Sequence, residues 1–309
     1  MLVGAFGHDA TAPNVDIRMC PSILGGQPCG AREGALALRD RSPCNDAQAS
    51  HRATLACVHE PATVPISFEP GDEDAALVQP PDASDGTCRW CHGVADADGA
   101  MCVDCDENAS ALDGLIQPII PITLYAKPSR MRDWLTFYKD DGDDLADPAA
   151  QLAIRTIVER FLIENLQWVS ALRIDGALIV PSTLRRPPHP LGLLLEGRAS
   201  RSLQVLQGLE RTAAQLGHNR PNVHAFAASK ALRGKRVLLL DDVYASGARA
   251  QSAAYALRHV GTEVAALLVI ARRYNPTYSE RGAGVFARQS ALPFTWSAEV
   301  RDLTRTSGV

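Results

Sequence analysis

Over its second half the chain alternates between apolar runs of strand length and amphipathic patterns of helical spacing. The apolar runs are 177–180, 237–240 and 264–271. The helical patterns are 152–166, 203–216 and 250–260. Asp147 and Pro148 provide an N-cap and a first turn for the first helix, and Gly217 and Gly261 end the other two. Continuously apolar strands between amphipathic helices predict an α/β fold, in which a mostly parallel sheet carries helices on both faces.

The first part of the chain lacks such patterns. Residues 1–85 are rich in Ala, Gly, Pro, Asp and Ser and show no sustained period, which predicts a poorly ordered N-terminal segment of low complexity. Its acidic, turn-rich end, 69–86, has the composition of a linker. A cysteine-dense stretch follows, and then 115–139 mixes strand-like apolar residues with basic ones. We therefore expect three parts: 1–85, a small module at 86–110, and the α/β domain at 115–309.

Composition narrows the environment of the protein. The formal net charge of −4 gives no general attraction to nucleic acid or to anionic membranes. The longest apolar run, 264–271, is far too short to cross a bilayer, and the first residues lack the basic and apolar regions of a signal peptide. Without an export signal, the eight cysteines are better explained as thiols and metal ligands than as disulfides. We expect a cytoplasmic protein with no membrane partner.

Four of the cysteines have the spacing of a zinc ribbon. Two residues separate Cys88 from Cys91, two separate Cys102 from Cys105, and ten lie between the pairs. Two tight turns of this kind can complete a tetrahedral Zn²⁺ site that has no open position for a catalytic water. We expect a structural zinc ion that stabilises a segment too small for its own core. Redox-active or unligated thiols are the alternative.

The residues around this ribbon, and the remaining cysteines, carry weaker signals. We expect His92 to be a neighbour of the metal and not a ligand. Acidic residues close to the ribbon argue against phosphate contact there; they are Asp96, Asp98, Asp104, Asp106 and Glu107. The earlier cysteines lack ribbon spacing, so free thiols are favoured over a second metal site that would include His51 or His59. These cysteines are Cys20, Cys29, Cys44 and Cys57.

The most informative segment is 236–249, where an apolar strand ends in two acidic residues and a short Ser/Gly loop leads into a helix. Asp241 and Asp242 can accept hydrogen bonds from vicinal ribose hydroxyls. Gly247 permits a positive φ, and the helix N-terminus offers N–H groups and a favourable dipole to a phosphate. The segment predicts a site for a phosphorylated sugar, with an ordinary βα turn and solvated acids as the alternative. The residues of this site are Asp241, Asp242, Ala245, Ser246, Gly247, Ala248 and Arg249.

A second loop follows the apolar run 177–180. It places the hydroxyls of Ser182 and Thr183 and the guanidinium groups of Arg185 and Arg186 at the carboxyl edge of the sheet. Arginine forks suit phosphate oxygens, although loop arginines are often simply solvated. Further basic residues that could close over phosphates, or be ordinary surface charge, are Lys139, Arg220 and Lys230.

Segment 236–249 resembles the phosphoribosyl-diphosphate (PRPP) signature of the type I phosphoribosyltransferases. The resemblance implies that Asp241 and Asp242 hold the ribose 2′- and 3′-hydroxyls, that 245–249 wraps the 5′-phosphate, and that 181–186 is the pyrophosphate loop. It also implies Mg²⁺, carried largely by the diphosphate. The family commonly has hydroxyl side chains where this chain has Ala245 and Arg249. With the zinc module in front, the layout over 86–276 resembles the ComF-type competence-associated family.

Three functions are compatible with this resemblance. The first is transfer of phosphoribosyl from PRPP to a nitrogenous acceptor with release of pyrophosphate. The second is a regulator that binds PRPP or a nucleotide without turnover, which the residues at 245 and 249 favour. The third is an accessory role in DNA uptake or processing, which the net charge of −4 does not support.

Overall fold

The computed structural model describes residues 73–82, 86–95, 101–139, 146–182, 189–195, 203–217 and 219–301. All of them belong to one compact unit, 62–309. The early cysteines Cys20, Cys29, Cys44 and Cys57, together with His51 and His59, lie outside the described residues.

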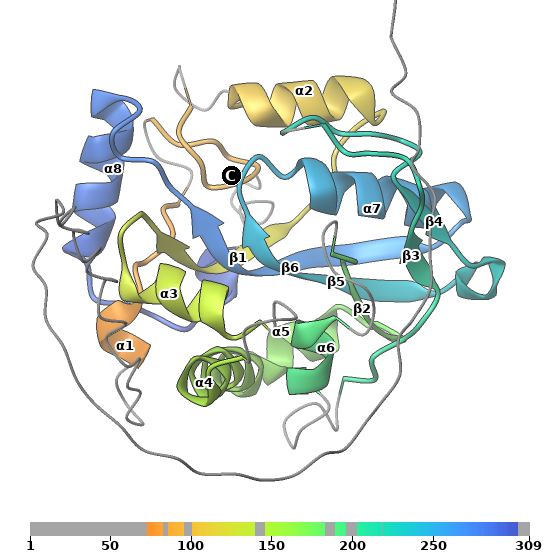
Figure 1. Ribbon diagram of the computed structural model, residues 1–309, viewed down its shortest axis with the longest axis horizontal. Coiled ribbons are helices and arrows are strands. Elements are labelled where there is room, and N and C mark those ends of the chain that lie inside the picture. Colours follow the sequence, from red (N-terminus) through yellow and green to blue (C-terminus); the bar gives the residue numbers. More distant parts are fainter. Residues whose placement is uncertain are drawn as a thin grey trace, which may run out of the picture. The chain divides into compact units, whose positions relative to one another are not determined.

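A four-stranded parallel sheet forms the centre of this unit (Figure 1). Its order is β1-β6-β5-β2, with β1 at Ile119–Tyr125, β6 at Glu263–Arg273, β5 at Arg236–Tyr244 and β2 at Gly176–Ile179. β5 and β6 contain the predicted apolar runs 237–240 and 264–271, and β2 contains the run 177–180 except its last residue, so the predicted α/β fold with a parallel sheet is confirmed. β5 and β6 extend beyond the apolar runs at their carboxyl ends, where functional residues are expected in such sheets.

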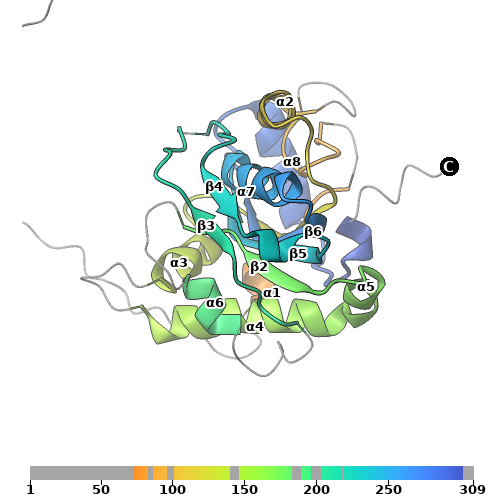
Figure 2. The same ribbon diagram turned by 90° about the vertical axis from the view of Figure 1, so that its right-hand side faces the viewer.

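Helices cover both faces of the sheet (Figures 1 and 2). One face carries α2 (Val103–Ala111) and α7 (Ala248–His259), and the other carries α3 (Arg130–Phe137), α4 (Pro148–Glu164), α5 (Leu166–Ala171) and α6 (Pro190–Leu195). The remaining helices are α1 (Glu73–Ala76), α8 (Glu280–Ser290) and the 3₁₀ turns η2 (Lys230–Leu232) and η3 (Glu299–Arg301). The predicted start of α4 is confirmed, because Oδ1 of Asp147 accepts hydrogen bonds from the amides of Ala149 and Ala150.

The alternation of side chains along β5 divides the interior into two cores. Leu238 and Leu240 belong to the core shared with α3, α4 and α6, whereas Val237 and Leu239 belong to the core shared with α7 and the cysteine module. Successive side chains of a strand point to opposite faces. A run of buried leucines is therefore what a strand covered on both faces requires.

The helix predicted over 203–216 is wrong. This segment is extended: Val205 bridges Ala177 of β2, and β3 (Leu209–Arg211) pairs antiparallel with β4 (Phe226–Ala228). The reason is that the backbone groups on the outer edge of β2 need hydrogen-bond partners, and this segment supplies them: the amide of Ala177 donates to the carbonyl oxygen of Gln204 at 2.8 Å. Gly208, at a φ of +110°, then turns the chain in a way that a helix cannot follow.

Residues 73–82 differ from the linker predicted over 69–86, because they pack against the outer edge of β1. Val78 bridges Leu124, and its amide also donates to Oγ1 of Thr123 at 2.8 Å. Leu77 is buried in the main core, and Glu73 pairs with Arg160 of α4 at 3.3 Å. These ten residues therefore belong to the folded unit.

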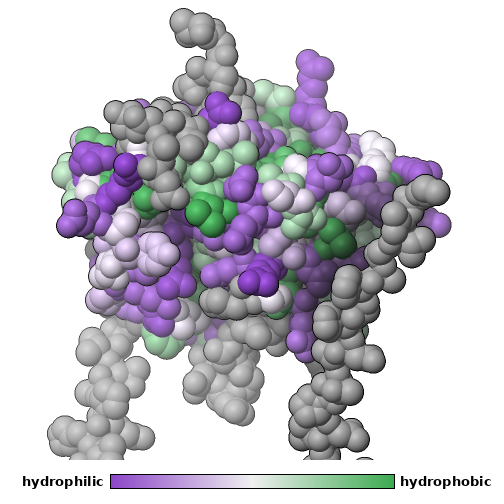
Figure 3. All heavy atoms as spheres, turned by 90° about the horizontal axis from the view of Figure 1, so that it is seen from above, coloured by the Kyte–Doolittle hydropathy of each residue, from purple (hydrophilic) through white to green (hydrophobic). Residues whose placement is uncertain are grey.

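One face of the surface is shown in Figure 3. In the coloured part of Figure 3, which looks onto the side of α2 and α7, apolar side chains are scattered among hydrophilic ones. No helix in the described part of the chain is both long enough and apolar enough to span a bilayer.

Candidate functional site

The site predicted at the carboxyl end of β5 has the expected backbone path. Asp241 and Asp242 lie in the last part of the strand, which ends at Tyr244, and α7 begins four residues later. Gly247 caps this helix with a φ of +83°, in the left-handed region that favours glycine. The first amides of α7 therefore face the loop without intrahelical partners.

The two carboxylates are buried and already surrounded by donors. Arg249 pairs with both of them, donating from Nη2 to Oδ1 of Asp241 and, at 2.8 Å, to Oδ1 of Asp242. Oδ2 of Asp242 accepts from the hydroxyl of Tyr138 at 2.8 Å and lies 2.5 Å from Nζ of Lys139. Two cations thus balance two carboxylates at this position.

One carboxylate oxygen differs from the others. Oδ1 of Asp241 accepts from the amide of Asp242 at 2.9 Å, as well as from Arg249. Oδ2 of Asp241 has no hydrogen-bond partner among the described residues. The sequence predicted that both acids would be acceptors for ribose hydroxyls. Arg249, Lys139 and Tyr138 occupy most of that capacity, and Oδ2 of Asp241 is the acceptor that remains.

Burial and charge act in opposite directions on the two carboxyl groups. Burial raises the pKa of Asp241 above its ordinary value, and the guanidinium of Arg249 offsets only part of the rise. Burial acts in the same direction on Asp242, but the charges of Lys139 and Arg249 outweigh it and hold the pKa of that carboxyl well below its usual range. Asp242 therefore stays ionised, whereas Asp241 keeps a proton to a higher pH.

A cleft of about 510 Å³ opens beside the loop. Ala245 and Ser246 line one side of it, Asp104 of α2 lines another, and Arg272 and Tyr274 at the end of β6 line a third. The cleft therefore joins the predicted phosphate loop to the cysteine module, and it is large enough for a small-molecule ligand.

The four predicted metal ligands come together as one cluster. Cys88, Cys91, Cys102 and Cys105 are buried, and their Sγ atoms all lie within 4.8 Å of one another. Sγ of Cys91 and Sγ of Cys102 are 3.5 Å apart. Four thiolates at the usual Zn–S distance of about 2.3 Å would be about 3.8 Å apart, so the cluster fits a tetrahedral metal such as zinc.

His92 stands outside this cluster, as predicted. Its ring is fully buried, with Nδ1 2.6 Å from the carbonyl oxygen of Pro81 and Nε2 3.2 Å from that of Ile119. Both ring nitrogens therefore face carbonyl oxygens, and His92 connects the module to residues 73–82 and to β1.

The predicted pyrophosphate loop is described only at its start. Ser182 follows β2 at the carboxyl edge of the sheet and is half-buried, while Thr183, Arg185 and Arg186 lie outside the described residues. Asp96 and Asp98 of the acidic set near the ribbon also lie outside them.

The three further basic candidates have different positions. Lys139 is part of the site through Asp242. Arg220 is exposed, and Lys230 lies in η2, which leads into the amino end of β5, the end opposite the two acids.

Sequence reasoning missed three residues that shape the site. Tyr138 donates to Asp242, Asn108 donates from Nδ2 to the carbonyl oxygen of Ser246 at 2.8 Å, and Arg272 contacts both the loop and the cysteine module. Asp242 and Ser246 are 104 and 138 residues from their donors, and Arg272 is 181 residues from Cys91 and 28 from Tyr244, so no local pattern could have revealed these contacts.

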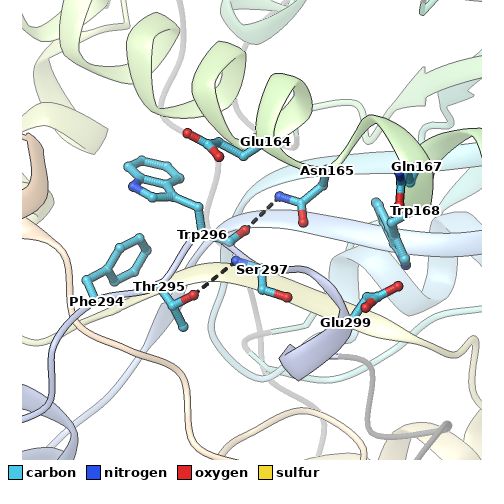
Figure 4. A pocket seen from close by; sticks show the side chains of 9 residues that line it. All are labelled: Glu164, Asn165, Gln167, Trp168, Phe294, Thr295, Trp296, Ser297 and Glu299. Atoms are coloured by element: carbon cyan, nitrogen blue, oxygen red, sulfur yellow. Dashed lines mark hydrogen bonds between the residues drawn. The ribbon is translucent and has the colours of Figure 1, made fainter.

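A second hollow of about 490 Å³ lies away from this site, where the end of α4 and the start of α5 meet residues 294–299 (Figure 4). Nδ2 of Asn165 donates to the carbonyl oxygen of Trp296 at 2.6 Å and fixes the C-terminal segment there. Phe294 and Trp168 also line the hollow. It contains none of the predicted site residues.

Comparison with known proteins adds no assignment. No model of a protein family matches the chain, and no curated protein is significantly similar to it. The geometry of the loop and of the cysteine cluster therefore has to carry the functional argument.

Proposed function

We propose that the protein binds PRPP with Mg²⁺ at the carboxyl end of β5 and transfers its phosphoribosyl group to a nitrogenous acceptor, releasing pyrophosphate. One observation carries this proposal. Two adjacent buried carboxylates stand directly before a loop whose glycine, at a φ of +83°, starts a twelve-residue helix. Carboxylates for the sugar and helix amides for the phosphate are the two elements that a phosphorylated ribose requires.

The charge balance of the site supports an anionic ligand. Isolated carboxylates would repel a diphosphate, but Arg249 and Lys139 neutralise the pair before any ligand arrives. The side chains of Lys139 and Arg249 are 17% and 26% exposed, so both keep access to the surface. Mg²⁺ bound by the diphosphate would supply the remaining positive charge.

The residues of the site would have separate roles in binding PRPP. Oδ2 of Asp241 would accept a hydrogen bond from a ribose hydroxyl, because it has no other described partner. Asp242, which Lys139 and Arg249 keep ionised, would hold these two cations beside the leaving group. The loop 245–249 would enclose the 5′-phosphate.

A regulator that binds PRPP without turnover is the second candidate, and one contact favours it. Arg249 occupies both carboxylates from a position where hydroxyl side chains are common in the family that the loop resembles. If Arg249 has to move before the sugar can bind, affinity can persist while catalysis is lost. An acceptor screen that follows pyrophosphate release in saturating PRPP and Mg²⁺ distinguishes the two candidates.

The binding step is tested by calorimetric titration of PRPP in Mg²⁺ with the double variant Asp241→Asn, Asp242→Asn. Hydrogen bonds to charged groups contribute about 1.5–3 kcal/mol each, so each bond lost should lower the affinity by roughly tenfold to a hundredfold. Asp113→Asn is the matched control, because Asp113 is exposed, lies outside the site and has a φ of +52° that Asn also tolerates. A folded double variant that binds PRPP as the parent does would refute the proposal.

A further inference from the structure

Arg272 is a buried cation at the junction between the cysteine module and the predicted phosphate loop. It is the tenth residue of β6 and is 5% exposed. Towards the module, its Nε donates to the carbonyl oxygen of Cys91 at 3.1 Å, and its Nη2 lies 3.6 Å from Sγ of Cys91. Towards the loop, its Nη1 donates to the carbonyl oxygens of Tyr244, at 3.1 Å, and Ala245.

The charge of Arg272 lacks an ordinary partner. No carboxylate pairs with it in the part of the chain that the structure describes. The carboxylate of Asp104 lies within electrostatic range of it. The group of opposite charge that it contacts is the cysteine cluster, because four thiolates around a divalent metal would carry a net charge of −2. A buried cation is costly unless it is paired. The metal-bound cluster and the loop carbonyls are therefore what hold this guanidinium in place.

A second contact joins the same two parts. Asn108 is 1% exposed and lies in α2, directly after the second cysteine pair. Its Nδ2 donates to the carbonyl oxygen of Ser246 at 2.8 Å. The carbonyl groups of three consecutive residues, Tyr244 to Ser246, thus accept hydrogen bonds from the module or through Arg272. The backbone of the loop is thereby held from the side of the module.

We infer that Arg272 is a positioning residue for the phosphate loop, and that occupancy of the four-cysteine metal site controls the affinity of that loop for phosphorylated ligands. The inference rests on the proposed function for its ligand, PRPP. The module then affects the ligand site as well as stabilising its own segment. Loss of the metal would release Cys91, remove the negative charge beside Arg272, and free the loop carbonyls that Arg272 and Asn108 hold.

Gly93 allows the coupling to be tested while the four cysteines and the loop residues are all kept. A Cβ atom at Gly93 would overlap Nη2 of Arg272, so Gly93→Ala displaces the guanidinium and keeps all four cysteines. A Cβ atom there would also lie 3.1 Å from Sγ of Cys91, so the metal content of the variant has to match that of the parent. Gly284→Ala in α8 is the matched control, since its Cβ would meet the nearest atom, Nη1 of Arg288, at an ordinary 3.5 Å. Arg272→Gln removes the charge, and Arg288→Gln, at an exposed position, controls for it.

The experiment measures PRPP affinity, metal content and melting temperature for each full-length variant, and for the parent before and after treatment with a zinc-selective chelator that leaves Mg²⁺ in place. Titrations are made well below each melting temperature. We expect Arg272→Gln and chelation to weaken PRPP binding at least tenfold, and Gly93→Ala at least threefold. The α8 variants should match the parent. If the cysteine module had a purely structural role, the substitutions and chelation would lower the melting temperature and leave the affinity of the folded protein unchanged.

Hydrogen exchange at the amides of 245–249 provides a readout that needs no ligand. It should accelerate on chelation and in Gly93→Ala. Parental affinity and parental exchange in folded, metal-depleted protein and in Gly93→Ala would overturn the inference, even if the parent binds PRPP. If the parent itself does not bind PRPP, the proposed function fails, and faster exchange would still show that the metal positions the loop.

Discussion

Replacement of Gly247 by alanine perturbs the predicted phosphate loop in two separable ways. The residue has a φ of +83°, where an L side chain costs about 1–2 kcal/mol. In addition, its Cβ atom would overlap the hydroxyl and the ring of Tyr244, whose side chain is 1% exposed and cannot move aside without disturbing its neighbours. Overpacking of this kind costs about 1–3 kcal/mol. We expect Gly247→Ala to lower the free energy of unfolding by about 2–5 kcal/mol.

Two other glycines separate these contributions. Gly261 has the same φ of +83°, but the nearest atom to its Cβ is 3.6 Å away, and Gly234, at +75°, has no atom within 4 Å. Gly261→Ala and Gly234→Ala should therefore cost only the backbone contribution of about 1–2 kcal/mol. Urea unfolding at 25 °C measures all three variants, and calorimetric titration measures their affinity for PRPP.

The two measurements together test the account of the loop. Gly247→Ala should bind PRPP at least tenfold more weakly than the parent, because the ring of Tyr244 and the loop have to shift. The variants at 234 and 261, at the other end of the sheet, should bind as the parent does. If Gly247→Ala is no less stable than Gly234→Ala and retains parental affinity, the close packing of this loop against Tyr244 is not what the structure indicates.

Three further predictions follow from the same contacts. Burial raises the pKa of Asp241, so the folded protein keeps a proton on this carboxyl at pH values where the unfolded chain has lost it. The free energy of unfolding therefore falls as the pH rises from the ordinary pKa of an aspartate to the raised pKa of Asp241. Asp241→Asn should be more stable than the parent at pH 8 and lose this advantage near pH 4, and urea unfolding midpoints at the two pH values measure the difference. Tyr138→Phe removes a buried hydrogen bond to Asp242 and should lower the free energy of unfolding by about 1.5–3 kcal/mol, with parental stability in urea as the contrary result. A chain that starts at Ala62 should melt close to the parent, whereas a chain that starts at Gly86 loses the burial of residues 73–82 and should melt several degrees lower; equal melting temperatures would contradict the packing of that segment.

The sequence predicts local features of this molecule well, because strand, acid pair, glycine and helix follow one another without interruption over 236–259. The cysteine cluster was predictable for the same reason, since each pair is set by a single turn. The segment 203–216 was assigned wrongly because leucines three or four residues apart also occur in an irregular extended segment. What decided its structure was the edge of β2, which lies elsewhere in the chain.

Long-range contacts lie beyond such reasoning. Lys139 was a candidate for a phosphate, yet its partner is Asp242, 103 residues later. Arg272 was not among the basic candidates, and its contact with the cysteine module depends on Cys91, 181 residues earlier. Charge pairs of this kind follow from how the strands are ordered in the sheet, and the spacing of residues along the chain does not contain that order.

The bridge between Val78 and Leu124 has a consequence for the behaviour of the protein in concentrated solution. An open sheet has two free edges, and an uncovered edge is a template on which another chain can add a strand. Here Val78 covers part of the outer edge of β1, and Val205 covers part of the outer edge of β2. Both ends of the sheet are thereby partly shielded from edge-to-edge aggregation, one by a segment with the composition of a linker and the other by a segment whose leucines predict a helix.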